Sequence, residues 1–119
     1  MLEQSFAEQF ATEWIEAWNS HDLQRILAHY TEDFEMTTPY IIQITGEPSG
    51  CLKGKEAVGA YWAKGLQRSP NLQFELLEFL IGVNSLTLYY QNHRGQFVAE
   101  VMHFAADGKV EKAFAHYTS

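Results

Sequence analysis

Apolar side chains near the start of the chain recur at every fourth position. This spacing places them on one face of an α-helix, and it is kept by Phe6, Phe10, Trp14 and Trp18. Ser5 with Glu8 resembles a capping box at the beginning of that helix. The pattern breaks at Asn19-Ser20-His21-Asp22. The sequence therefore predicts a first helix over about Ser5–Asn19.

Two further helices and one short strand are expected before residue 70. Leu23–Tyr30 places its apolar residues on one side of a helix, and Lys55–Gln67 does the same over a longer range. Phe34–Thr38 combines aromatic and β-branched residues just before Pro39, which predicts a strand. The segment Gly46–Gly50 is rich in turn-forming residues and predicts a loop.

The chain after Pro70 is strand-like. The expected strands are Leu72–Gly82, Leu86–Asn92, Gln96–Ala105 and Val110–Thr118. The breaks between them are short, and Asp107-Gly108 is the clearest turn signal, so these strands form an antiparallel meander. Helices followed by a meander predict an α+β architecture. A length of 119 residues suits a single domain over 1–119.

Composition narrows the classes of partner. The formal net charge is -7 and there is no basic stripe, which disfavours binding to nucleic acid. No apolar run approaches the length of a membrane span, and no signal peptide is evident at the N-terminus, so we expect a cytoplasmic protein with no membrane partner. The histidines lack the paired spacing of metal ligands, so neither a metal nor a cofactor is expected.

Three segments resemble the nuclear transport factor 2-like superfamily, which includes ketosteroid isomerase and the SnoaL-like polyketide cyclases. They are Trp18–Asp22 with Tyr30–Phe34 and Thr38-Pro39, then Leu52–Val58, then Glu100–Phe104 with Asp107–Val110 and Tyr117. The resemblance implies a cone-shaped barrel, in which a curved antiparallel sheet wraps around three helices from the N-terminal half. It also implies a homodimer formed through the outer face of the sheet. Because this fold hosts many activities, the resemblance alone does not identify the reaction.

The resemblance places the carboxyl group of Glu100 inside the cavity. A carboxyl on an apolar wall has a raised pKa, and in its protonated form it could donate a hydrogen bond to an enolate or ketone oxygen. Glu100 is therefore the candidate catalytic residue. The alternative is that it faces solvent, or pairs with Arg94 or Lys112 across the strands.

Other positions argue against ketosteroid isomerase chemistry itself. The position of that enzyme's general-base aspartate is held here by Thr38, and the position of its oxyanion-donating tyrosine by Trp14. Threonine cannot shuttle a proton near neutral pH, and an indole N–H donates a hydrogen bond without acting as an acid. His103 and His116 would lie on the outer face of a regular sheet. Cys51 is either a reactive thiol or an ordinary small residue at the mouth of the cone.

The resemblance also implies which side chains line the cavity. The predicted ligand-binding residues are Trp14, Trp18, Tyr30, Phe34, Met36, Thr38, Tyr40, Tyr61, Trp62, Met102 and Tyr117. Such a lining suits a small apolar or aromatic ligand. Two functions follow. One is a ligand-binding SnoaL-like isomerase, cyclase or hydratase that uses Glu100, assisted by Tyr117 or Trp14. The other is a non-catalytic dimeric module that binds a ligand or a protein.

Overall fold

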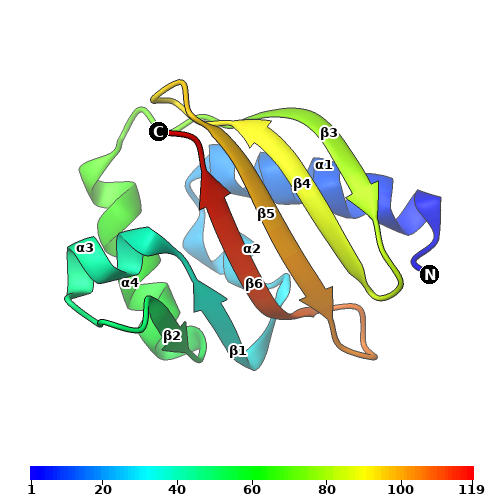
Figure 1. Ribbon diagram of the computed structural model, residues 1–119, viewed down its shortest axis with the longest axis horizontal. Helices are drawn as coiled ribbons and strands as arrows, with labels where there is room; N and C mark the ends of the chain where they lie inside the picture. Colours follow the sequence, from blue (N-terminus) through cyan, green and yellow to red (C-terminus); the bar gives the residue numbers. More distant parts are fainter.

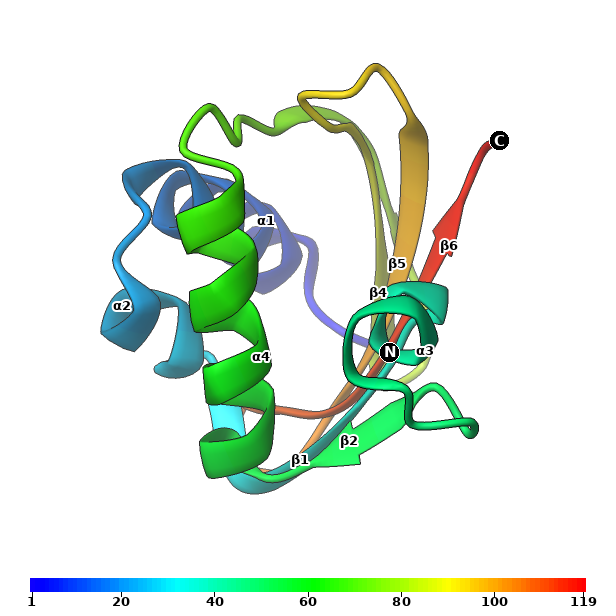
Figure 2. The same cartoon turned by 90° about the vertical axis from the view of Figure 1, so that its left-hand side faces the viewer.

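The computed structural model describes all of residues 1–119. In it, helices pack against one curved sheet. Three helices, α1 (Gln4–Ser20), α2 (Leu23–Leu27) and α4 (Lys55–Arg68), lie on the concave side of the sheet (Figure 2). A fourth and shorter helix, α3 (Pro39–Thr45), lies near one edge. None of the helices has both the length and the apolar character needed to cross a membrane.

The sheet has six strands in the order β2-β1-β6-β5-β4-β3 (Figure 1). Their bounds are β1 Tyr30–Thr37, β2 Cys51–Lys53, β3 Glu75–Ile81, β4 Ser85–Gln91, β5 Phe97–Phe104 and β6 Val110–Tyr117. Every neighbouring pair is antiparallel except β1 and β6, which run parallel. The sheet curves around the helices without closing, so the expected cone is an open one.

The α+β class and the meander β3–β6 are confirmed. The N-cap of α1 is Glu3, without a side-chain hydrogen bond, so Ser5 and Glu8 form no capping box, and β3 begins at Glu75 rather than Leu72. The larger differences lie between residues 27 and 53. The second helix ends at Leu27 rather than Tyr30, because Tyr30 already pairs with Val110 as the first residue of β1. Helix α3 and strand β2 were not predicted. Thr38 caps α3 by accepting a hydrogen bond from the Tyr40 N–H, and Pro39 fits the first helical turn.

The apolar core fills one end of the concavity. Phe10 of α1 packs edge-on against Phe104 of β5, with 5.0 Å between the ring centroids, and Phe6 packs on the same ring at 5.4 Å. Burial alternates along β5, so that Val98, Glu100, Met102 and Phe104 face inward. Toward the other end, around Glu100, the same inner face borders a cavity.

Candidate functional site

A cavity of about 320 Å³ lies between helices α1 and α4 and the inner face of the sheet. This volume is at the lower end of the range of roughly 300–1,000 Å³ that small-molecule pockets span. The predicted residues that line it are Trp14, Trp18, Met36, Thr38, Tyr40, Tyr61, Trp62, Glu100 and Tyr117. The fold thus brings together side chains from α1, β1, α3, α4, β5 and β6.

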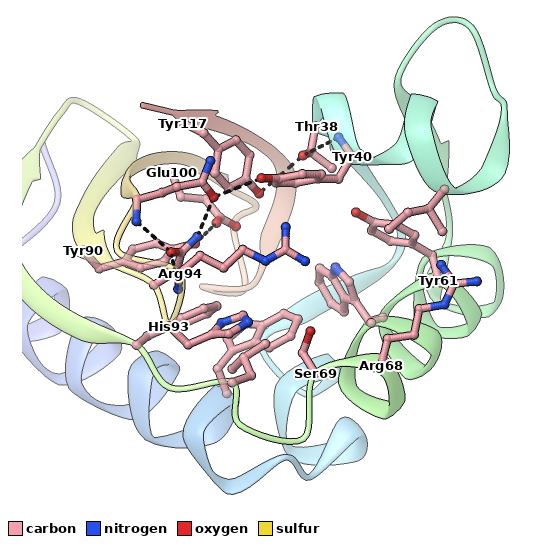
Figure 3. Close-up of a pocket in the computed structure, with 18 of the residues that line it drawn as sticks. Thr38, Tyr40, Tyr61, Arg68, Ser69, Tyr90, His93, Arg94, Glu100 and Tyr117 are labelled. Atoms are coloured by element: carbon pink, nitrogen blue, oxygen red, sulfur yellow. Dashed lines mark hydrogen bonds between the residues drawn. The ribbon is translucent and has the colours of Figure 1, made fainter. Parts of the chain in front are cut away.

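Glu100 lies on the cavity wall with only 4% of its surface exposed. Its Oε1 accepts a hydrogen bond from the Tyr90 hydroxyl at 2.8 Å, and its Oε2 receives none from the protein (Figure 3). Burial raises the pKa of Glu100 from 4.5 to about 7, and the Tyr90 hydrogen bond offsets part of that rise. Near neutral pH the carboxyl therefore exists in both protonation states.

Three tyrosines line the cavity with Glu100. Tyr90 and Tyr117 belong to the sheet, and Tyr61 belongs to α4 on the opposite side. Burial, with a smaller effect from the Glu100 charge, raises the pKa of Tyr61 to about 12 and that of Tyr117 further above its usual value. The pKa of Tyr90 is raised for the same two reasons. All three therefore stay protonated at neutral pH and can act as hydrogen-bond donors. Thr38 Oγ1 donates to the Tyr117 hydroxyl at 3.4 Å.

Three predicted pocket residues belong to the core instead. Tyr30, Phe34 and Met102 are almost fully buried and do not line the cavity. Tyr30 and Phe34 pack against each other at 4.4 Å between ring centroids, and Met102 lies deeper than Glu100 on the inner face of β5. Both rings also pack against the ring of Trp62, which lines the cavity, with 5.1 and 5.6 Å between ring centroids.

The Trp14 indole N–H is already engaged. Its Nε1 donates to the Tyr30 hydroxyl at 2.9 Å, and both groups are buried. Trp14 therefore contributes a ring face to the cavity, and the expected assistance from its N–H is not supported. Trp18, one helical turn further on, differs: its Nε1 is buried and has no hydrogen-bond partner.

The mouth of the cavity contains polar residues that sequence reasoning did not assign to it. They are Gln43, Arg68, Ser69, Asn92, His93, Arg94 and Gln96. Arg68 and Arg94 are both exposed, and both belong to the lining. The β4–β5 turn and the end of α4 meet at this mouth (Figure 3). The polar run Asn92–Gln96 is the sequence signal that could have assigned the β4–β5 turn to the mouth.

The remaining candidates lie elsewhere. His103 and His116 are exposed on the outer face of the sheet, as the strand alternation predicts. Cys51 lies in β2, half-buried and 4.0 Å from Glu35 Oε1, and it does not line the cavity mouth. Glu100 is the one acidic residue of the lining, and neither Arg94 nor Lys112 forms an ion pair with it.

Comparison with known proteins places the chain. The family model described as the SnoaL-like domain matches residues 11–113. A SnoaL-like protein of unknown function from Burkholderia thailandensis is 52% identical over 98% of both chains, and its structure superposes with a TM-score of 0.96. None of the curated proteins matches the chain.

More distant structures share the fold. A protein from Cytophaga hutchinsonii described as nuclear transport factor 2-like, of unknown function, is 16% identical over 99% of this chain and 95% of its own, with a TM-score of 0.70. A SnoaL-like protein from Agrobacterium tumefaciens, provisionally described as an isomerase, is 14% identical over 98% of this chain and 100% of its own, with a TM-score of 0.77. With the family match and the shared fold, the chain belongs to the SnoaL-like family of the nuclear transport factor 2-like superfamily.

Proposed function

We propose that this protein binds a small, largely apolar molecule in the cavity and that Glu100 transfers a proton to or from it. The observation that carries the proposal is a single buried carboxyl, with one oxygen free of protein partners, in a cavity whose lining is rich in aromatic rings. An acid–base catalyst is most effective when its pKa lies near the working pH. Glu100, with a pKa of about 7, meets that condition.

The geometry fits proton transfer at a carbon next to a carbonyl group. The Glu100 carboxylate would take a proton from a carbon that lies between the carbonyl group and a carbon–carbon double bond, and the electron pair would move to the carbonyl oxygen as a conjugated enolate. The same carboxyl would then return the proton to the far carbon of that conjugated system, which moves the double bond. The Tyr117 hydroxyl on the sheet and the Tyr61 hydroxyl on α4, across the cavity, would donate hydrogen bonds to the enolate oxygen. This sequence of steps describes an isomerase, and the isomerase assignment of the Agrobacterium protein supports the same class.

Hydrogen–deuterium exchange of a simple ketone tests the proposal. In deuterated water, 2-tetralone loses its α-hydrogens through the same enolate, and NMR or mass spectrometry follows the exchange. We expect the protein to accelerate this exchange, and Glu100→Gln to lower the acceleration by about 100-fold or more. Glu111→Gln, an exposed change on β6 outside the cavity, is the matched control and should keep the full rate.

The exchange experiment also separates catalysis from binding. Quenching of the cavity tryptophans by 2-tetralone reports binding independently of exchange. Binding without accelerated exchange would leave a ligand-binding module and reject proton transfer. Equal exchange rates for the wild-type protein and Glu100→Gln would reject the role of Glu100.

We also propose that a second copy of the chain covers the outer face of the sheet. The support is an exposed apolar surface there: Leu80 is 56% exposed, and Tyr89 and Phe97 are each 38% exposed. The Tyr89 and Phe97 rings stack on each other with 6.0 Å between centroids, across paired strands β4 and β5. An exposed apolar surface of this kind is typical of a self-complementary interface.

A further inference from the structure

The charged side chains at the cavity mouth are positive, although the chain as a whole is negative. Only 8 of the residues are Lys or Arg, against 15 Asp and Glu. Nevertheless, two arginines, Arg68 and Arg94, line the cavity. Neither takes part in an ion pair, since the ion pairs of the structure involve Arg25, His29 and Lys112. Two cationic groups at the mouth are therefore left without an anionic partner.

Arg94 is held in place by the cavity wall. Its guanidinium carbon lies 5.8 Å from the centroid of the Tyr40 ring, a cation–π contact. That ring is itself fixed, because the Tyr40 hydroxyl donates to Gln96 Oε1 at 2.9 Å and the ring packs edge-on against Tyr117 at 4.8 Å. Figure 3 shows Arg94 reaching from the β4–β5 turn toward the side of the mouth where Arg68 lies. Stacking on one face leaves the N–H groups at the guanidinium edge available.

The hydrogen-bonding capacity of the two guanidinium groups selects the ligand chemistry. A guanidinium can only donate hydrogen bonds, so it pairs best with a ligand group that only accepts them. A carboxylate is such a group, and its negative charge balances that of an arginine. Among the other lining residues, Trp18 is 7% exposed, and neither its buried Nε1 nor the buried His93 Nδ1 has a hydrogen-bond partner.

We propose that the cavity selects ligands with a carboxylate attached to an apolar ring system, and that Arg94 and Arg68 bind the carboxylate at the mouth. The inference rests on the proposed binding function and names the class of ligand that it would take. The apolar body would lie among the tryptophans, and the carboxylate would replace the solvent around the guanidinium groups. Glu100, buried further along the wall, then faces the ring system rather than the anionic group.

A matched pair of probes tests the inference. At neutral pH, 2-naphthoate is an anion, and 2-naphthamide has nearly the same shape without the charge. Tryptophan fluorescence would give the dissociation constant of each. We expect 2-naphthoate to bind about tenfold more tightly than 2-naphthamide, the size of effect given by one charge-assisted pair. Arg94→Gln should remove most of the preference for 2-naphthoate and should change the dissociation constant of 2-naphthamide by less than about twofold. Arg68→Gln should also reduce the preference for 2-naphthoate.

Lys64→Gln is the matched control, because Lys64 is an exposed cation on α4 outside the cavity lining. It removes the same charge and should leave the preference intact. If both probes bind equally well to the wild-type protein, or if Arg94→Gln weakens both equally, the carboxylate inference is overturned while the binding function stands. If neither probe binds at its solubility limit, the binding function fails as well.

Discussion

The Glu100 carboxyl is buried in the folded protein and exposed to water in the unfolded chain, and this difference links its proton to stability. Its pKa is about 7 when folded, against a usual value of 4.5. Below the lower value both states are protonated, and burial of the carboxyl removes no charge from water. As the pH rises toward 7 the unfolded state ionises first, and the folded state becomes less favourable relative to it. Above about 7 that loss is complete.

The free energy of unfolding should therefore fall with rising pH because of Glu100. The rise in the pKa from 4.5 to about 7 corresponds to a loss of about 3 kcal/mol in the free energy of unfolding. About 2 kcal/mol or more of this loss should occur between roughly pH 5 and pH 8. Urea unfolding at these two pH values, followed by tryptophan fluorescence, measures the loss. Glu100→Gln cannot ionise, so the fall should be smaller in that variant by about the same amount. Equal pH dependence in the two proteins would contradict the raised pKa.

At the scale of single elements, Gly54 before helix α4 and Gly65 inside it have opposite roles. Gly54 precedes the helix with φ of 91°, a backbone conformation that L-residues rarely adopt, and its N–H donates to the Phe34 carbonyl at 2.7 Å. Gly65 lies inside the helix, and a Cβ added there would meet no atom within 4 Å. Glycine is required at the first position and only weakens the helix at the second.

We expect Gly54→Ala and Gly65→Ala to change stability in opposite directions. Gly54→Ala should lower the free energy of unfolding by about 1–2 kcal/mol through backbone strain. Gly65→Ala should raise it by about 0.5–1 kcal/mol, because alanine favours the helix. Thermal unfolding of the two variants beside the wild-type protein measures both effects. A stabilising Gly54→Ala would show that the left-handed conformation of Gly54 is not required.

The elements also show why part of the site was predictable and part was not. Helix α1 has a strong periodic pattern, so Trp14 and Trp18 could be assigned to its apolar face. Neither face of β5 is purely apolar, so the inward position of Glu100 followed from the family resemblance and not from periodicity. Helix α3 is rich in isoleucine, a β-branched residue that favours strands, so its sequence does not predict a helix. Strand β2 is only three residues long, which is too short for a periodic pattern. The parallel pairing of β1 with β6 depends on contacts distant in sequence, which hairpin rules do not describe. For the same reason the approach of Arg68 and Arg94 to one cavity required the folded structure.

At the scale of the whole molecule, the proposed dimer can be tested on the outer face of the sheet. We expect sedimentation equilibrium to show a dimer for the wild-type protein and a monomer for Phe97→Asp, because a buried aspartate without a partner would disfavour association. Val83→Asp adds the same charge at a residue that is 81% exposed in the β3–β4 turn, and it should leave the dimer intact. A wild-type monomer at high micromolar concentration would rule out the dimer.

The place of β6 in the sheet has a consequence for synthesis. This strand follows the other five along the chain, yet it lies between β1 and β5 and joins the β2–β1 pair to the β5–β4–β3 meander. A nascent chain lacking residues 110–117 would hold two unconnected pieces of sheet, each with an open edge and an exposed apolar face. The sheet that forms one wall of the cavity is therefore continuous only when β6 is in place.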